Sequence, residues 1–182
     1  MNKIPKKHHI LFWCLALGGS IFDLWTKAAI FKKVGPPGSD PISLVNHILE
    51  LRTSHNTGAL WGMGHNLPYS SLIFAGLSVV AAILIIWWLF PQGAAKDFWL
   101  TVALGLIMAG AMGNCYDRLM FGHVRDFMHF HIDPIGFDCA IFNFADNMLV
   151  AGAVILMILA LKPPLEDPSV DSPVNPAAPV LD

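Results

Sequence analysis

The feature that most constrains this chain is the segment SLIFAGLSVVAAILIIWWLF at positions 71–90, which contains no charged residue. A helix needs about 20 mostly apolar residues to cross the hydrocarbon core of a bilayer. Charged residues make up only 13% of the whole chain, whereas soluble domains contain about 25%. The sequence therefore predicts an integral membrane protein.

Other segments of the chain are also apolar enough to cross a bilayer. We expect four spans, at about 9–30, 71–90, 98–116 and 142–161. The third is rich in glycine and alanine, which suits close helix packing in lipid. The connector PQGAAKD between spans two and three is short, so we expect these helices to form an antiparallel pair. The expected fold is an all-α membrane protein with a small β element.

Two long connectors separate the remaining spans, at 31–70 and 117–141. The first contains the alternating pattern ISLVNHILELRTS, which predicts one or two short strands. We expect these connectors to form a β-rich cradle outside the cytoplasm. Residues 1–162 are expected to form a single domain, and 163–182, rich in proline, serine and aspartate, a disordered tail.

Four spans place both ends of the chain on the same side of the membrane. Lys3, Lys6 and Lys7 precede the first span and favour the cytoplasmic side for both termini. Other basic residues oppose this rule because they fall on the far side: Lys32, Lys33, Arg52, Arg118 and Arg125. The first span lacks an A-x-A-like cleavage site, so we interpret it as a permanent anchor.

The composition gives little support to several classes of partner. A net charge of −2 indicates no nucleic-acid partner. The chain has three cysteines, Cys14, Cys115 and Cys139, and no CxxC motif. An odd count without that motif indicates neither a disulfide framework nor a zinc site, and we interpret all three as small apolar residues.

The predicted topology gathers polar residues at one face of the membrane. They are Asp23, Lys27, Asn56, Asn114, Asp117, Asp126, Asn143 and Asp146. Ionisable groups at membrane depth are costly unless paired or hydrated, so their default interpretation is functional. The pattern Asn-x-x-Asp occurs twice among them, at 114–117 and 143–146, and residues three apart share one face of a helix.

Some of these charges have a partner nearby in the sequence. Asp117 is followed by Arg118, and we expect the two to form a structural ion pair. Asp23 and Lys27 stand four residues apart, which is the spacing of a helical ion pair. For these residues a structural role is favoured.

Asp126 and Asp146 have no such cation in register, because Arg125 would point to the opposite face of an extended segment. Two carboxyls held close together share one proton near neutral pH. The ionised member can then take a proton from water while the neutral one donates a hydrogen bond to a peptide carbonyl. These two residues are the better candidates for acid–base chemistry.

Other catalytic machinery has weaker support. The sequence contains neither HExxH nor GxSxG, and Ser70 and Ser71 have no compelling histidine or lysine companion. His123, His129 and His131 lie near Asp126 in the sequence, and H-x-H with a carboxylate is a possible zinc site. Interfacial histidines are the favoured interpretation, so we expect no metal and no cofactor. A proton relay in a transporter is a second possibility, but no internal inverted repeat supports it.

Five motifs in order along the chain carry a family resemblance. They are DLWTK at 23–27, NTGALWG at 56–62, GNCYDR at 113–118, GHVRDF at 122–127 and FNFAD at 142–146. Over about residues 10–161 the chain resembles the bacterial lipoprotein signal peptidases, also called type II signal peptidases, which are four-span aspartic peptidases. One residue departs from the family pattern: Arg125 replaces a small apolar residue.

The resemblance implies a function and a set of site residues. Asp126 and Asp146 would be the catalytic dyad. Support roles are implied for Asp23, Lys27, Asn56, Gly58, Gly113, Asn114, Asp117, Arg118 and Asn143. The implied substrate is a diacylglyceryl-modified prolipoprotein, cut just before the lipidated cysteine at the outer face of the bacterial inner membrane. Membrane lipid is the other expected partner, and the small bundle is expected to act as a monomer.

Overall fold

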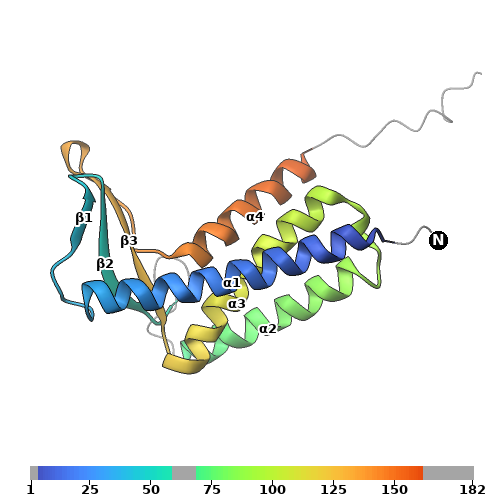
Figure 1. The fold of residues 1–182 in the computed structure, drawn as a ribbon, viewed down its shortest axis with the longest axis horizontal. Coiled ribbons are helices and arrows are strands. Elements are labelled where there is room, and N and C mark those ends of the chain that lie inside the picture. The colour runs from blue at the N-terminus through green and yellow to red at the C-terminus, as the bar shows by residue number, and fades with distance from the viewer. Residues whose placement is uncertain (1–3, 59–68, 162–182) are drawn as a thin grey trace, which may run out of the picture.

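The computed structural model describes residues 4–58 and 69–161 of the chain. The motif residues 59–62, Lys3 and the tail expected to be disordered lie outside the described residues. The described part contains four long helices and a small antiparallel sheet (Figure 1). This is the predicted fold class.

The helices are α1 (Lys6–Val34), α2 (Ser70–Leu89), α3 (Phe98–Phe121) and α4 (Phe144–Ala160). The first three are long and apolar enough to cross a membrane, and α4 is apolar but shorter, with 17 residues. A short 3-10 turn, η2 (Ala94–Lys96), joins α2 to α3. The predicted spans thus all coincide with helices.

The helix that contains the third predicted span extends beyond residue 116, where that span was expected to end. The helix continues to Phe121 and stops at Gly122, whose φ of 75° is left-handed, a conformation that glycine adopts without steric cost. Asp117 and Arg118 therefore lie in the last turns of α3 and not in the following connector. The helix can carry these charges because both are buried beside polar partners from other elements.

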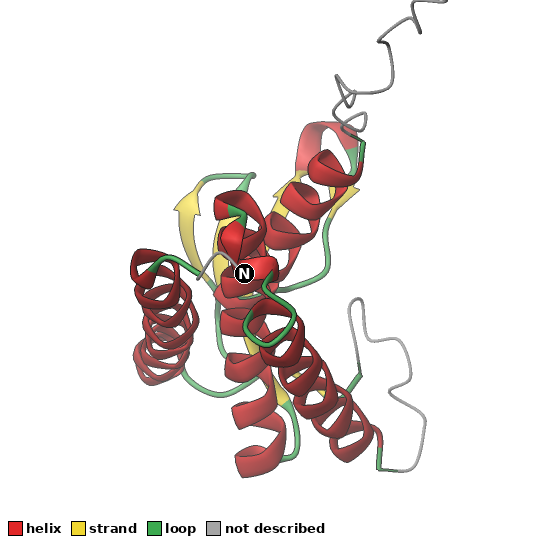
Figure 2. Ribbon diagram, turned by 90° about the vertical axis from the view of Figure 1, so that its right-hand side faces the viewer, coloured by secondary structure: helices red, strands yellow, loops and turns green. Residues whose placement is uncertain are grey.

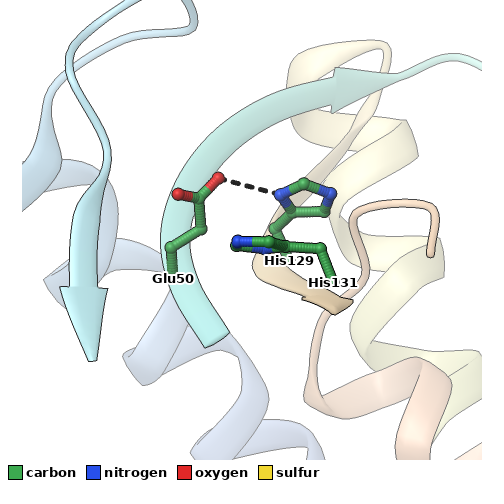
Figure 3. Close-up of side chains that lie close together, drawn as sticks. All are labelled: Glu50, His129 and His131. Atoms are coloured by element: carbon green, nitrogen blue, oxygen red, sulfur yellow. Dashed lines mark hydrogen bonds and ion pairs between the residues drawn. The ribbon is translucent and has the colours of Figure 1, made fainter. Parts of the chain in front are cut away.

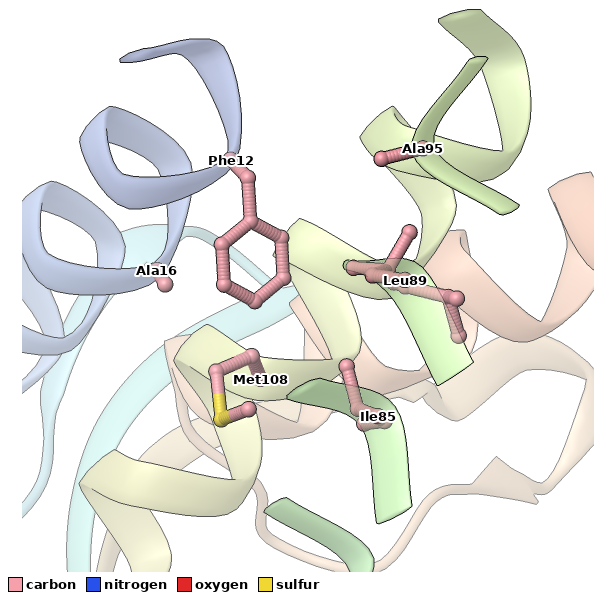
Figure 4. Close-up of a cluster of buried hydrophobic side chains, with 7 residues drawn as sticks. Phe12, Ala16, Ile85, Leu89, Ala95 and Met108 are labelled. Atoms are coloured by element: carbon pink, nitrogen blue, oxygen red, sulfur yellow. The ribbon is translucent and has the colours of Figure 1, made fainter. Parts of the chain in front are cut away.

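The central helix is α3, which packs against each of the other three. One apolar cluster lies near η2, at the end of the bundle away from the sheet (Figure 4). Its buried members are Phe12, Ala16, Ile85, Leu89, Ala95, Leu104 and Met108. Small residues allow the close approach of α3 and α4, since a Cβ at Gly110 would overlap the carbonyl oxygen of Ala145.

The sheet contains β1 (Ile42–Val45), β2 (Leu49–Asn56), β3 (Val124–Ile132) and β4 (Phe137–Asp138), in that spatial order and all antiparallel. A 3-10 turn, η3 (Asp133–Ile135), precedes β4. The first long connector, where one or two short strands were expected, contains β1 and β2. The length of β3 was not predicted, because its pairing with β2 joins segments distant in the sequence.

The sheet lies at the end of α1 opposite the N-terminus, and its strands run across the helix direction (Figure 1). Seen from the N-terminal end, the strands lie behind the helices (Figure 2). This arrangement brings β3 against the C-terminal part of α3 and the start of α4. The polar residues predicted to share one membrane face come from these same places.

We expect Gly110→Ala to destabilise the protein even though alanine favours a helix by about 1 kcal/mol over glycine. Overpacking typically costs about 1–3 kcal/mol, and the new Cβ would also lie 2.7 Å from Leu149 Cγ. Gly76→Ala is the control, because nothing lies within 4 Å of a Cβ there. Thermal unfolding in detergent, followed by circular dichroism, measures both. An unchanged midpoint for Gly110→Ala would contradict the close packing of α3 and α4.

Candidate active site

The first turn of α4 is built around a reciprocal cap. The side-chain oxygen of Asn143 accepts a hydrogen bond from the Asp146 backbone N–H at 3.0 Å, and Asp146 Oδ2 accepts one from the Asn143 N–H at 3.1 Å. A capping box of this kind satisfies two donors that a helix start would leave unpaired. The second Asn-x-x-Asp pattern is therefore a helix cap that fixes the Asp146 carboxyl at the N-terminus of α4.

The amide nitrogen of Asn143 is free to bond outward from this cap. It donates to Asp126 Oδ1 at 2.5 Å and to Asn114 Oδ1 at 3.2 Å. Asn114 in turn donates from Nδ2 to Asp146 Oδ1 at 2.9 Å. The two Asn-x-x-Asp patterns are thus interlocked, and Asn114 bonds the aspartate of the other pattern.

Asp126 reaches this network from β3. Backbone hydrogen bonds join the strand to the residue before the cap, with Phe142 accepting from Met128 N–H at 2.8 Å and donating to Met128 at 2.9 Å. On the neighbouring strand, Asn56 donates from Nδ2 to Asp126 Oδ2 at 3.1 Å. The sheet therefore sets the Asp126 carboxyl between two amides, one from β2 and one from the start of α4.

Both candidate carboxyls contact Asn143, Asp126 through its side-chain amide and Asp146 through its backbone. Asp126 is 2% exposed and Asp146 is half-buried. Burial, followed by the negative charge of Asp146, raises the pKa of Asp126 to about 7, while hydrogen bonds from Asn56 and Asn143 partly oppose the shift. One carboxyl of this pair can therefore hold a proton near neutral pH.

A buried lysine joins the helices behind the carboxyls. Lys27 Nζ lies 2.8 Å from Asp23 Oδ2, 2.8 Å from Asn114 Oδ1 and 3.4 Å from Asp117 Oδ2. The predicted Asp23–Lys27 pair is confirmed. Asp23 also accepts a hydrogen bond from the Ala145 N–H at 2.9 Å, which ties α1 to the start of α4.

Gly113 is needed where α3 passes this lysine site. A Cβ at Gly113 would overlap Asp23 Oδ2. A side chain there would displace the Asp23 carboxylate from Lys27 or push α1 and α3 apart. The glycine thus allows the charged side chains of two helices to meet.

The expected ion pair between Asp117 and Arg118 is wrong. Asp117 is paired instead with Arg125, whose Nη2 lies 2.8 Å from Asp117 Oδ1 and whose backbone N–H donates to Asp117 Oδ2 at 3.0 Å. Arg118 donates from Nη2 to the carbonyl oxygen of Gly58 at 3.0 Å. Consecutive residues on a helix point in different directions, so neighbours in the sequence meet different elements.

Arg125 was the residue that sequence reasoning left without a role. Its guanidinium lies 4.5 Å from the ring centroid of Phe121 while it pairs with Asp117. It points away from Asp126, as strand alternation predicts, and fastens the start of β3 to the end of α3. No spacing pattern could have revealed this pair, because the partner is on a different element.

An apolar cavity of about 550 Å³ opens beside the site. Its polar lining comes from Asn56, Ser78, Asn114, Arg118, Asp146 and Asn147. Apolar residues of α2, α3, α4 and the segment before α4 line the rest, including Phe74, Leu77, Ala111, Ile141 and Leu149. Ligand pockets commonly have volumes of about 300–1,000 Å³ with a few polar groups in apolar walls.

Comparison with known proteins identifies the family. The family model for signal peptidase (SPase) II matches residues 15–162. The chain belongs to the signal peptidase II family. It is 38% identical to a lipoprotein signal peptidase of Rhodopirellula baltica over 85% of this chain and 73% of that one, and 33% identical to one of Staphylococcus aureus over 78% and 82%.

Two solved structures of bacterial membrane enzymes have the same fold. One aligns with a TM-score of 0.72 at 31% identity, over 82% of this chain and 87% of that one. The other aligns with a TM-score of 0.71 at 30% identity, over 83% and 92%. The protein is therefore a membrane peptidase, as the sequence motifs predicted.

We expect Lys27→Met to lower folded yield and thermal stability sharply. It would leave Asp23 and Asp117 without their shared cation, and breaking a buried ion pair costs about 3–5 kcal/mol. Lys33→Met is the matched control, since Lys33 is exposed on the same helix. Size-exclusion recovery and thermal unfolding measure the effect. Normal yield combined with lost turnover would instead place Lys27 in the catalytic chemistry.

Proposed function

We propose that this membrane peptidase is an aspartic endopeptidase that uses Asp126 and Asp146 to activate a water molecule. The observation that carries the proposal is that Asn143 contacts both carboxyls beside an apolar cavity. Three hydrogen bonds fix Asp146, from Asn114 and in the cap, and two amides fix Asp126. Preorganised carboxyls of this kind suit general acid–base catalysis.

The proposed reaction needs no covalent enzyme intermediate. One carboxylate removes a proton from water as the water oxygen attacks the scissile carbonyl carbon. The other, protonated, carboxyl donates a hydrogen bond to the carbonyl oxygen and stabilises the charge developing there. A proton then passes from the pair to the leaving amine as the C–N bond breaks.

The proposed substrate is a diacylglyceryl-modified prolipoprotein, cleaved just before the lipidated cysteine. The names of the relatives support the lipoprotein class. The cavity supports a substrate with a long apolar portion, because most of its walls are apolar. Asp146 is one of the few polar residues that line it. Asn56 and Arg118, also in that lining, would be placed to position substrate backbone.

We further propose that the enzyme lies in the bacterial inner membrane with both termini in the cytoplasm. The sheet and the dyad would then lie at the outer face, where acyl chains hold the scissile bond at the lipid boundary. Asn114, Asn143, Asp23, Lys27, Asp117, Gly58, Gly113 and Arg118 would be supporting residues. A proton-coupled transporter that uses the same acids as a relay remains the rival function.

Cleavage of a synthetic diacylated prolipoprotein peptide in detergent micelles tests the dyad. We expect Asp126→Asn and Asp146→Asn each to reduce kcat by at least about 10³-fold, since each removes a group that acts in the transition state. Asp40→Asn is the matched control, because Asp40 is exposed in a loop. Near-normal cleavage by either dyad variant, with the protein folded, would refute the mechanism, and acid-dependent flux without cleavage would favour the transporter.

The pH–rate profile provides a second test. The pKa of Asp126 is raised to about 7, so the pair keeps one proton below that pH and loses it above. We therefore expect kcat/KM to fall as the pH rises through about 7, because the free enzyme then lacks its acid. A rate that rises through this range would contradict a protonated Asp126 in the active form. The Asp40→Asn variant should show the same profile as the parent chain.

A further inference from the structure

A second cluster of side chains lies on the sheet, outside the proposed dyad. Glu50 on β2 and His129 and His131 on β3 each offer one metal-ligating atom, and these atoms all lie within 4.8 Å of one another (Figure 3). Residues two apart on a strand project from the same face, which brings the two imidazoles together. Glu50 is the register partner of His129 across the strand pair, so the carboxylate reaches the same point.

The hydrogen bonds of His129 match those of a metal ligand. Its Nδ1 lies 2.8 Å from Glu50 Oε1, and its Nε2 lies 2.6 Å from Asp138 Oδ1 on β4. A metal-bound histidine usually gives its other ring N–H to a carboxylate, which fixes the ring and raises its basicity. With Nε2–H donated to Asp138, Nδ1 is left facing Glu50 as the coordinating atom.

The geometry points to a binding site for a divalent transition-metal ion, with Zn²⁺ the best match, held by Glu50, His129 and His131. Zinc takes imidazole nitrogen and carboxylate oxygen at about 2.0–2.2 Å, which puts tetrahedral ligand atoms about 3.4 Å apart. Small side-chain rotations would therefore bring the three ligand atoms from their present separations, within 4.8 Å, to the spacing of a tetrahedral site. The ion would lie between His129 Nδ1 and Glu50 Oε1, in place of the contact these atoms now make, and water fills the fourth position.

The proposed metal site is separate from the catalytic carboxyls. Glu50 pairs in register with His129, whereas Asp126 pairs with Ser54, farther along the two strands. The ion would instead link β2 and β3 directly and β4 through Asp138. Its role is to stabilise the sheet, independently of the peptidase chemistry proposed above.

One cation competes for the same carboxylate. Arg52 Nε lies 2.8 Å from Glu50 Oε1, with the Arg52 side chain 47% exposed. Exposed ion pairs are worth at most about 1 kcal/mol, so the guanidinium can move aside. Its positive charge nevertheless weakens the binding of a metal cation. Removing this charge should therefore tighten metal binding, whereas removing a ligand should weaken it.

The experiment is a metal titration of the full chain, purified without a histidine tag, stripped of metal and held in detergent micelles. Co²⁺ reports coordination through its visible absorption, and calorimetry with Zn²⁺ gives affinity and stoichiometry. We expect one ion per chain with tetrahedral Co²⁺ absorption. His131→Asn and Glu50→Gln should each weaken Zn²⁺ binding by at least about tenfold, whereas Arg52→Gln should tighten it.

The matched control is His123→Asn. His123 stacks on His55 with ring centroids 3.7 Å apart and is one of the other imidazoles near this sheet. Binding should survive in this variant. If His123→Asn weakened Zn²⁺ binding as much as His131→Asn does, the proposed site would be wrong. An octahedral Co²⁺ spectrum would also contradict it, as would undiminished Zn²⁺ binding in both His131→Asn and Glu50→Gln.

Stability gives a readout that does not depend on catalysis. Excess Zn²⁺ should raise the thermal midpoint of the parent chain, because an ion that binds only the folded state stabilises it. Excess Zn²⁺ should leave the thermal midpoint of the His131→Asn variant unchanged. Equal shifts in the two proteins would mean that zinc binds elsewhere and would refute the proposal. His131 is half-buried, so its replacement is less disruptive than that of the buried His129.

Discussion

The buried ammonium of Lys27 is the interaction on which the rest of the site depends. It lies among groups from two helices, Asp23 on α1 and Asn114 and Asp117 on α3. A charge in this position is tolerated only because carboxylates and an amide surround it. Each of these neighbours also makes a second contact, since Asp23 holds the start of α4, Asn114 holds Asp146, and Asp117 holds Arg125 at the start of β3.

Two asparagines connect this lysine site to the two carboxyls by hydrogen bonds. An amide can donate and accept at once, so Asn114 accepts from Lys27 and donates to Asp146, while Asn143 caps α4 and donates to Asp126. A charged residue in either place would alter the proton balance of the carboxyl pair. Neutral amides position the carboxyls, and their hydrogen bonds to Asp126 lower its pKa by less than burial and the charge of Asp146 raise it.

Much of the site could be predicted because membrane sequences carry strong local signals. Long apolar runs located the helices, and polar residues near their ends marked the candidate site. The i, i+4 spacing predicted the Asp23–Lys27 pair, which is confirmed. Local reasoning was wrong for Asp117 and Arg118, since adjacency in the sequence does not mean adjacency of side chains on a helix. The helix that contains the third predicted span also continues beyond residue 116, because Asp117 and Arg118 find polar partners on other elements.

The sequence by itself determined the membrane class, the helices, the family and the residues of the candidate dyad, because hydrophobic length and ordered motifs are local properties. The tertiary structure decided which partner each polar group has. The pairing of β2 with β3 brought Asn56 to Asp126 and Glu50 to His129, and the packing of α3 against β3 gave Arg125 its partner. Those contacts join segments far apart in the chain, where no spacing rule applies and only the register of strands and the packing of helices fix which atoms meet.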